Sequence, residues 1–363
     1  MKIFIEPFDT LFFKDGKPFS MGEDNWADGH FPPMPSVFYG ALRSAYFSQN
    51  PNQLHLANEE GDPTQDLVIS RIHVARNDKR RVVGYIPCPM DVVKEKNNNS
   101  NQDQYHILEV GNSDSSQISS SPIPTQLRSS APERVEYDKS SWFNLGNWNK
   151  YATGEIRESS LKNTSKFLIH EPKIGIGRSR YTGSSEEGQL YRVGMKRMCK
   201  NYGFVVEFSG LDSLQSNGIL KLGAEGKGAS YHEIDKPFDI PNTPRKTEPK
   251  KVKMIFTTPA VFSQGWLPKG VDLKSLEGVW NGFKLKVTHV CVGAFVSIGG
   301  FNMKAGKGMK VGPKPMYRAI PAGSVFYVEP EDFDGFIEAF HDRCISEFGL
   351  SREGFGHILL QVV

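Results

Sequence analysis

The sequence predicts an α+β protein made of two helix-plus-sheet domains that carry long insertions. Its length of 363 residues exceeds what one hydrophobic core usually supports, so two domains are expected. Residues 1–86 show the order strand, loop, helix and paired strands, and the stretch 252–363 combines strand-like segments with an amphipathic helix. Between these regions, segments rich in asparagine and serine interrupt the apolar patterns.

The N-terminal elements follow from residue alternation and turn signals. Ile3 and Ile5 alternate with polar neighbours, which predicts a strand that Pro7 ends. Ser36, after a run of prolines, is expected to cap a helix that continues to Tyr46. The segments 67–74 and 82–86 are expected to be paired strands. This order begins a βαββ unit, as ferredoxin-like and RNA-recognition-motif (RRM-like) folds require.

Two insertions are expected within the first domain. The first, near 97–135, is rich in Asn, Ser and Gln, and such a segment buries too little apolar area to offset its ordering entropy. The second, near 140–167, places Trp142, Phe143 and Trp148 among polar residues. These aromatic side chains are expected to pack against the body of the protein or against a partner.

The remaining strand and helix signals define a second domain. They lead us to expect an N-terminal domain over 1–190 and a C-terminal domain over 191–363. The elements expected in the second domain are strands over 203–208 and 252–257, a hairpin or bent strand over 285–298, a strand over 324–328, a helix over 332–348 and a closing strand over 357–362.

Charge is balanced overall but is unevenly distributed. The net charge is only +3, which neither requires nor excludes a polyanionic partner. Between Gly278 and Val328, however, no Asp or Glu occurs. Within this stretch, a glycine-rich basic loop over 299–318 combines backbone freedom with spaced cations, which suits an RNA backbone; the alternative is a flexible basic loop. Its candidate RNA-binding residues are Gly299, Gly300, Lys304, Lys307, Lys310, Lys314 and Arg318.

A second candidate site lies between the glycines of segment 174–183. Arg178 and Arg180 can pair with phosphate through two parallel hydrogen bonds or stack on a base, and Tyr181 offers a stacking face for single-stranded RNA. The alternative is that the neighbouring acidic residues Glu186 and Glu187 pair with these arginines in an ordinary turn.

The predicted helix after the prolines offers a third candidate. Its N-terminal amides, with Ser36 nearby, would favour a phosphate, and Arg43 follows one to two turns later. Gly40 lowers helix propensity by about 1 kcal/mol relative to alanine, so it is expected to permit close approach of another backbone. That backbone is either RNA or a facing strand.

Signals for catalysis, metal binding and membrane insertion are weak or missing. His30 precedes the predicted helix, and its imidazole could act as a general acid–base in RNA cleavage, but a lone loop histidine is usually not catalytic. The four cysteines are far apart and match no zinc spacing. We therefore expect no enzyme activity, no metal and no cofactor, and a cytoplasmic protein without a signal peptide or membrane span.

Four segments together resemble one family, the crRNA 5′-tag-binding subunit of the type III-B CRISPR Cmr complex in the RAMP superfamily. The segments are 6–19 with 31–43, 171–191, 222–227, and 297–304 with 314–328. The second, with Gly175-Ile-Gly177-Arg178 at its centre, is the most specific to the family. The resemblance leaves roughly residues 97–165 uncovered.

The resemblance implies a fold, a role and partners. The fold would be two tandem ferredoxin-like (RRM-like) domains with long insertions. The role would be non-catalytic: the chain would hold the 5′ tag of crRNA for antiviral defence and bridge the large polymerase-like Cmr subunit to the first repeat-backbone Cmr subunit. Two alternatives remain open, a RAMP endoribonuclease that processes precursor crRNA and a structural adaptor that binds mainly protein.

Overall fold

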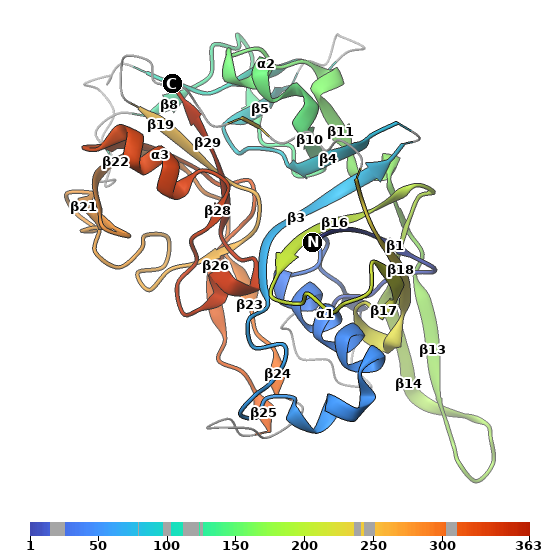
Figure 1. The fold of residues 1–363 in the computed structure, drawn as a ribbon. Coiled ribbons are helices and arrows are strands. Elements are labelled where there is room, and N and C mark those ends of the chain that lie inside the picture. Colours follow the sequence, from blue (N-terminus) through green and yellow to red (C-terminus); the bar gives the residue numbers. More distant parts are fainter. Residues whose placement is uncertain are drawn as a thin grey trace.

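A computed structural model describes most of the chain. The described residues are 1–14, 26–78, 80–96, 103–111, 123, 126–235, 241–242, 251–302 and 311–363. Strands dominate this mixed α/β structure, which is built on two large sheets with several small sheets around them (Figure 1).

The first large sheet has eight strands, which come from residues between Lys2 and Glu233. In spatial order its strands are β11 (Leu161–Asn163), β10 (Ser141–Asn144), β4 (Val82–Pro87), β3 (Val68–Asn77), β16 (Tyr202–Ser209), β1 (Lys2–Pro7), β18 (Gly228–Glu233) and β17 (Asn217–Lys221). The predicted first strand is confirmed, and so is the pairing of the two strands after the helix, as β3 with β4.

The centre of this sheet is formed by strands from distant parts of the sequence. The order β3–β16–β1–β18 is antiparallel throughout. Strands β1 and β3 therefore run parallel with β16 between them, and helix α1 (Pro35–Gln49) makes the crossover that parallel strands need. In the corresponding connection between β16 and β18, residues 210–227 contain β17 and the short 3-10 helix η5 (Ala224–Gly226).

Helix α1 begins at Pro35, not after a serine cap. A proline at the first helical position lacks only an N–H that would have no partner in the helix. Met34 is the N-cap residue, and no side chain caps this end, so the expected cap by Ser36 is wrong. The buried face of α1 includes Phe38 and Leu42, which pack in one core with Ile3 and Ile5 of β1.

The second large sheet has six strands, all from the C-terminal third. Their spatial order is β21 (Glu277–Trp280), β22 (Phe283–Cys291), β27 (Val325–Pro330), β19 (Val252–Phe256), β29 (His357–Val362) and β28 (Arg343–Cys344). The four strands β22–β27–β19–β29 are again antiparallel neighbours, with the first strand in sequence paired to the third and the fourth.

Helix α3 (Phe333–Phe340) covers one face of the second sheet. Its N-cap residue Asp332 accepts a hydrogen bond from the backbone N–H of Gly335 at 3.1 Å. The predicted helix over 332–348 is too long, because His341 is extended and Asp342 has a φ of +60°, which ends the helix before β28. Phe336 and Phe340 of α3 pack in the core that also contains the apolar residues of β19 and β29.

The opposite face of the second sheet is covered by the first half of the chain. Phe143, Trp148 and Tyr151, from β10 and helix α2 (Trp148–Ala152), are buried in one core with Ile255 and Leu359 of β19 and β29. Figure 1 shows this segment, coloured green, to the upper right of the second sheet. The expectation that the aromatic side chains of the 140–167 segment pack against the body is thereby confirmed for Trp142, Phe143 and Trp148.

The division between the sheets differs from the expected domain boundary at 190/191. Strand β16, which contains the expected strand 203–208, lies at the centre of the first sheet, and β17 and β18 follow in the same sheet. The second sheet begins only at Val252. Sequence pattern alone did not show this, because β16 pairs with β1 and β3, whose partners cannot be read from local periodicity.

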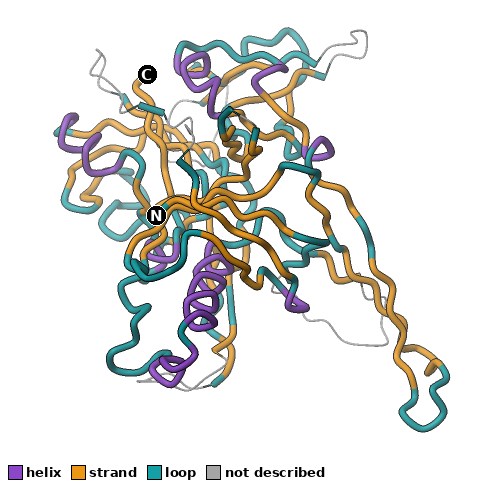
Figure 2. Tube along the Cα trace, turned by 45° about the vertical axis from the view of Figure 1, so that its right-hand side comes forward, coloured by secondary structure: helices purple, strands orange, loops and turns teal. Residues whose placement is uncertain are grey.

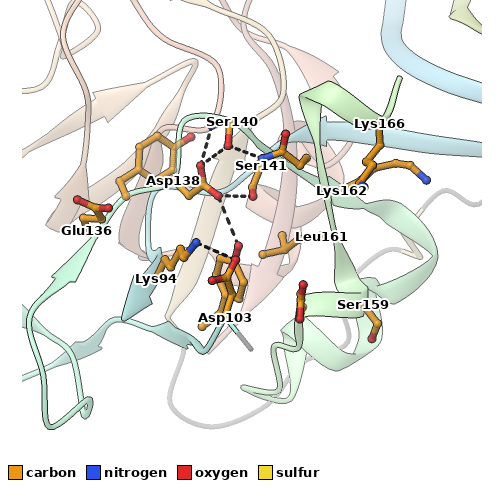
Figure 3. A pocket seen from close by; sticks show the side chains of 14 residues that line it. Lys94, Asp103, Glu136, Asp138, Ser140, Ser141, Ser159, Leu161, Lys162 and Lys166 are labelled. Carbon is orange, nitrogen blue, oxygen red and sulfur yellow. Dashed lines mark hydrogen bonds and ion pairs between the residues drawn. The ribbon is translucent and has the colours of Figure 1, made fainter. Parts of the chain in front are cut away.

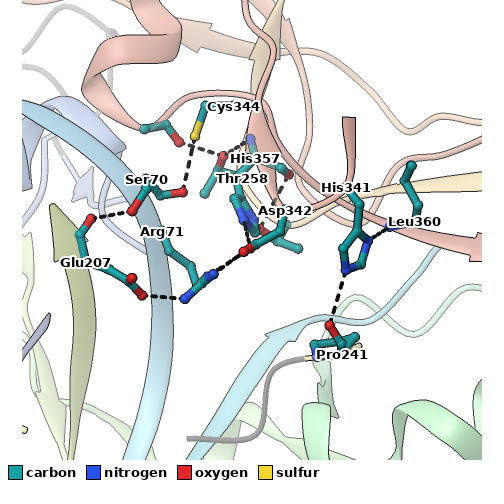
Figure 4. A network of polar contacts seen from close by, with 12 residues as sticks. Ser70, Arg71, Glu207, Pro241, Thr258, His341, Asp342, Cys344, His357 and Leu360 are labelled. Atoms are coloured by element: carbon teal, nitrogen blue, oxygen red, sulfur yellow. Dashed lines mark hydrogen bonds and ion pairs between the residues drawn. The ribbon is translucent and has the colours of Figure 1, made fainter. Parts of the chain in front are cut away.

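Polar contacts join the two sheets at a second place (Figure 4). Arg71 of β3 pairs with Glu207 of β16 and with Asp342, beside β28. Asp342 also accepts a hydrogen bond from Nε2 of the buried His357 at 2.9 Å, and Nδ1 of His357 lies 2.6 Å from the hydroxyl of Thr257. The two halves are thus connected by a buried network and by a shared apolar core.

Smaller elements surround the large sheets. The small strands are β2 (Trp26–Asp28), β5 (Val92–Glu95), β6 (Tyr105–Ile107), β7 (Glu109–Val110), β8 (Leu127–Arg128), β9 (Val135–Glu136), β12 (Leu168–His170), β13 (Lys173–Arg178), β14 (Ser185–Gly194), β15 (Lys196–Met198), β20 (Ala260–Val261), β23 (Val296–Ile298), β24 (Phe301–Asn302), β25 (Gly312–Pro313) and β26 (Tyr317–Ile320). The remaining 3-10 helices are η1 (Pro51–Leu56), η2 (Leu145–Asn147), η3 (Glu158–Ser160), η4 (Thr164–Lys166) and η6 (Leu350–Glu353). Among the described residues, no helix is both long and apolar enough to span a bilayer.

Candidate RNA-binding surface

A long hairpin of β13 and β14 projects from the first sheet, as Figures 1 and 2 show. It is antiparallel, and Gly175 stands opposite Tyr191. A Cβ at Gly175 would lie 2.1 Å from Cζ of Tyr191, so the tyrosine ring covers the glycine and no larger residue fits there without a shift. The packing of the Tyr191 ring therefore explains why a glycine stands at position 175.

The tip of the hairpin presents the second group of predicted RNA-binding residues. Nε of Arg178 donates a hydrogen bond to the carbonyl of Gly183 at 2.8 Å, and Gly183 has a φ of +68°. This contact closes the tip. Arg180 is exposed, and the side chain of Tyr181 is 100% exposed. The structure thus places Arg178, Arg180 and Tyr181 together at the end of one projection.

One face of the same hairpin is apolar. Side chains on one strand of a hairpin alternate between its two faces, so Ile174 and Ile176 share a face, and Leu190 is paired with Ile176. All three side chains are about half exposed or more, at 62%, 52% and 48%. Exposed apolar side chains of this size in one place are typical of a contact surface for another molecule.

Ion pairs fix the base of the hairpin to the first sheet. Lys173 pairs with Glu225 at 3.0 Å, and Arg197 binds Glu171 through two hydrogen bonds of 2.6 and 2.9 Å. Arg197 and Lys227 both bind Asp9, at 2.9 and 3.1 Å. Three segments that are distant in the sequence, around residues 9, 171 and 225, thereby meet.

The pKa of Asp9 reflects this environment and the adjacent backbone. The N–H of Thr10 lowers it most, and the cations of Lys227 and Arg197 lower it further, to about 2. The ion pairs also show that the glycine-rich segment 222–227 orients the hairpin. It supplies Glu225 and Lys227 to the ion pairs, a role that sequence reasoning missed because it depends on partners from other segments.

The second projection is the glycine-rich basic hairpin of the C-terminal unit. Met316 lies over Gly299, since a Cβ there would come within 2.3 Å of the Met316 sulfur, and the N–H of Lys314 donates to the carbonyl of Gly300 at 2.8 Å. Lys314 and Arg318 are exposed, and the guanidinium of Arg318 lies 4.8 Å from the centre of the Phe295 ring. The predicted residues Lys304, Lys307 and Lys310 lie outside the described residues.

The candidates on helix α1 have a different environment from the one expected. Nε of Arg43 donates to Thr64 at 2.7 Å, and Nη2 donates to Asn58 and Asp62 at 2.9 and 2.6 Å. These bonds fix the loop before β3, so Arg43 has a structural role there. Ser36 lies half-buried in the first turn of the helix.

Gly40 is exposed on α1 and packs against no other part of the described chain. A Cβ added there would meet no atom within 4 Å. The expected approach of a facing strand to Gly40 is therefore not present. What stays open from the sequence prediction is the approach of another molecule to this part of the helix.

An apolar pocket of about 410 Å³ lies where the two units meet. Trp142 and Leu168 from the first half line it, together with Pro321 and Val296 from the second, and His30 lines it as well. The other lining residues with polar side chains include Lys139, His170 and Lys196. A volume of this size accommodates a nucleobase or a small side chain. Of these residues, the sequence marked only His30 for a role in chemistry, because the pocket is assembled from separate segments.

A second pocket has a lining that does not suit a polyanion. It measures about 810 Å³ and lies between the small sheet β6–β5–β9 and strands β10 and β11 (Figure 3). Lysines line it, but so do Asp103, Glu136, Asp138 and Glu158, and Lys94 pairs with Asp103 at 2.7 Å. RNA phosphates would meet these carboxylates, so we place the candidate RNA surface on the two hairpins and the junction pocket instead.

The two hairpins extend from different sheets, and their candidate residues form separate groups. The tip with Arg180 and Tyr181 is distant from the β24–β25 segment in the view of Figure 1. A surface built from both groups would therefore contact an extended ligand at separated points, as single-stranded RNA allows. Among the described residues, no group of three or more His, Cys, Asp or Glu side chains has an arrangement that could hold a metal ion.

Comparison with known proteins connects these features to one family. A family model described as "CRISPR-associated protein (Cas_Cmr3)" matches residues 3–362. A search of curated proteins found no match.

Two solved structures of high coverage show a similar fold. One is described as "Cryo-EM structure of the Type III-B Cmr-beta bound to cognate target RNA", and the other contains AMPPnP in addition. In both cases the TM-score is 0.52 and the identity is 16%, over 93% of this chain and 89% of the other. At this identity the likeness concerns the fold alone.

Proposed function

The chain belongs to the Cas_Cmr3 family of CRISPR-associated proteins, and from this premise we propose that it is a non-catalytic RNA-binding subunit of a type III-B Cmr effector complex. In that complex it would hold the 5′ tag of crRNA and bridge the large polymerase-like subunit to the first repeat-backbone subunit. The family match over residues 3–362 carries the proposal, and the exposed Arg180 and Tyr181 of the projecting hairpin support it.

We also infer that each large sheet derives from a ferredoxin-like unit. In such a βαββαβ unit the first strand pairs with the third and the fourth, as β1 and β19 do here. Each unit keeps one of its two helices, α1 in the first and α3 in the second. Two such units offer two sheet-based surfaces to a single RNA strand.

Binding of tag RNA tests the central part of the proposal. The purified chain should bind single-stranded RNA that carries the tag more tightly than RNA of the same length without it. The logarithm of the affinity should fall linearly with the logarithm of salt concentration, with a slope of about −0.7 for each neutralised phosphate. Fluorescence anisotropy at several salt concentrations measures both quantities. A chain that binds the two Cmr subunits but not RNA would be the protein-binding adaptor.

The endoribonuclease remains a second candidate because of the junction pocket. His30 and His170 both line it, together with Lys139 and Lys196, and imidazole and ammonium groups in one pocket are suitable residue types for metal-free RNA cleavage. Incubation with repeat RNA in a chelating buffer separates the two candidates. Our proposal expects no cleavage by the wild-type chain and unchanged RNA processing when His30→Ala is placed in the assembled complex. Loss of processing with normal binding would favour the enzyme.

A further inference from the structure

Two stacked aromatic rings stand at the surface beside the basic hairpin. They are Tyr317, at the start of β26, and Phe348, in the loop between β28 and η6. Their ring centres are 5.0 Å apart and their planes differ by 25°, which is an offset-stacked pair. Phe348 is the outer ring, with 56% of its surface exposed.

The backbone at Phe348 has a conformation that phenylalanine rarely adopts. Its φ is +58°, in the left-handed region, where a bulky side chain is disfavoured and glycine or asparagine is preferred. The next residue, Gly349, has a φ of +73°. The side chain of Phe348 is half exposed and lies outside the buried core, where it stacks on Tyr317. Residues held in such conformations gather at functional sites.

The loop that carries Phe348 is fixed by the residue before it. The carboxylate of Glu347 accepts hydrogen bonds from the backbone N–H groups of Ser263 and Lys269, both at 2.6 Å. The backbone N–H of Glu347 donates to the carbonyl of Val261 at 3.0 Å. Phe348 is thereby held in place before any ligand arrives, which reduces the entropy lost on binding.

The charges around the ring pair suit a phosphate backbone. Lys314 lies three residues before Tyr317 in the sequence, and it is exposed. A further carboxyl group near this edge is that of Glu353 in η6, within electrostatic range of Lys314, Arg352 and Arg43. Burial raises the pKa of Glu353, and this effect outweighs the three cations.

We propose that Phe348, supported by Tyr317, is a stacking platform for one unpaired nucleobase, with Lys314 placed for a neighbouring phosphate. The proposal rests on the proposed RNA-binding function and adds a subsite to it. An exposed ring face accepts any base, and spaced cations bind the backbone. Arg318, next to Tyr317 in β26, faces the opposite side of the strand and stacks on Phe295 at 4.8 Å, so it is not part of this subsite.

The left-handed backbone at Phe348 allows a sharp test. Phe348→Asn removes the ring but suits the backbone, so the variant should unfold at a temperature no lower than that of the wild type. The affinity of the full chain for tag RNA should fall about 5- to 150-fold, the change that corresponds to ~1–3 kcal/mol of base stacking. Phe348→Trp, which keeps a ring, should retain the affinity. The control is Phe8→Asn, at a phenylalanine of similar exposure, 59%, in the first unit.

The outcomes separate this proposal from the one on which it rests. If the wild type binds RNA and Phe348→Asn binds it equally well, the platform is refuted while the RNA-binding function stands. If the wild type shows no salt-dependent RNA binding, both are refuted. If Phe348→Asn keeps its RNA affinity but fails to assemble with Cmr subunits, the ring pair is a protein contact and the platform is again refuted. Photocrosslinking of bromouridine-substituted tag RNA to Phe348 or Tyr317 is the positive result expected.

Discussion

The hairpin tip separates two arginines that look equivalent in the sequence. Nε of Arg178 is bonded to the carbonyl of Gly183, so this side chain closes the tip. Arg180 and Tyr181 stand further out, with Tyr181 fully exposed. A substitution at Arg178 therefore tests folding of the tip and binding together, whereas substitutions at Arg180 and Tyr181 test binding alone.

Replacing Arg180 with lysine is expected to weaken binding of tag RNA although the charge is kept. A guanidinium pairs with phosphate through a planar fork, and an ammonium group cannot reproduce it. Tyr181→Ala should remove ~1–3 kcal/mol of binding free energy because base stacking is lost, without lowering the unfolding temperature. Fluorescence anisotropy with tagged and untagged RNA measures both effects. Arg192→Lys, on the same hairpin, is the matched control. Full tag preference in both variants would show that the tip is structural.

For single residues, the sequence indicates which side chains could bind RNA but not which groups they contact in the folded protein. Ser36 and Arg43 were expected near a phosphate, yet Arg43 binds Asp62, Asn58 and Thr64. The acidic partner Asp62 lies in a loop whose position depends on the packing of α1 against the sheet. No spacing rule in the sequence gives that arrangement.

Among the elements, the basic hairpin carries the second group of candidate residues. Replacing its four lysines with alanine should weaken tag-RNA binding and make the dependence of affinity on salt less steep, because fewer phosphates are neutralised. The slope should become less negative by about 0.7 for each phosphate that a lysine no longer neutralises. The four residues to be replaced are Lys304, Lys307, Lys310 and Lys314.

The control for this prediction changes the net charge equally at other places in the same unit. An unchanged slope in the hairpin variant, or an equal change in the control, would remove the hairpin from the RNA surface. The exposed lysines replaced in the control are Lys269, Lys274, Lys284 and Lys286.

Local pattern predicted elements better than it predicted where they end or belong. The first strand, helix α1 and the β3–β4 pair were predicted because alternation and turn residues act over a few positions. The C-terminal helix was predicted too long, since its end depends on Asp342, which the interdomain network holds at a φ of +60°. Strand β16 was assigned to the wrong half, since strand pairing across the chain is not visible in a single segment.

A buried ion pair joins the two halves of the whole molecule. Asp91 of the first half is fully buried and binds Nζ of Lys253 in β19 at 2.8 Å. The hydroxyls of Tyr151 and Tyr327 also donate to Asp91, at 2.8 and 3.1 Å. The lysine lies 5.2 and 5.1 Å from the centres of these two rings. Such a satisfied cluster fixes helix α2 and the segment around Asp91 against the second sheet.

Removal of one partner should therefore be strongly destabilising. Lys253→Met leaves the carboxylate of Asp91 buried without its cation, and the expected loss is about 3–5 kcal/mol of unfolding free energy. Lys251→Met is the matched control, because Lys251 lies next to β19 and pairs with Glu329 at the surface, where a loss of about 0–1 kcal/mol is expected. Urea denaturation measures both values. Equal losses would show that the buried pair does not hold the halves together.

Stability should also fall as the solution becomes acidic. Burial lowers the pKa of His73 and of His357, whose rings are 5.6 Å apart; Arg71 lowers both further, while Asp342 acts in the opposite direction. Glu207 also faces His357 and raises its pKa. The unfolded chain binds protons at these histidines near pH ~6.5, whereas the folded chain does not. These histidines therefore do not lower the free energy of unfolding above pH ~6.5. As the pH falls below this value, the free energy of unfolding decreases by up to ~1.4 kcal/mol per pH unit for each histidine.

Urea unfolding at about pH 7.5, 6.5 and 5.5, which covers both sides of the ordinary histidine pKa of ~6.5, would measure this dependence. Below about pH 4, protonation of Asp342 should add to the loss: burial raises its pKa, but hydrogen bonds from His357 and Arg71 lower it well below the ordinary value. His73→Asn should flatten the profile between pH 7.5 and 5.5, and His55→Asn, at an exposed histidine, should not. A wild-type profile that is flat over this range would contradict the prediction.

The shared core between the halves has a consequence for how the protein is made. Phe143, Trp148 and Tyr151 leave the ribosome long before Leu359 of β29, the strand that completes their core. Until β29 is synthesised, the nascent chain carries an aromatic surface without its cover. Chaperones that hold exposed apolar segments should therefore bind this intermediate. A stop codon shortly before His357 should yield an aggregating product and not a smaller working protein. The two units, although they have separate sheets, therefore have to be retained together in evolution.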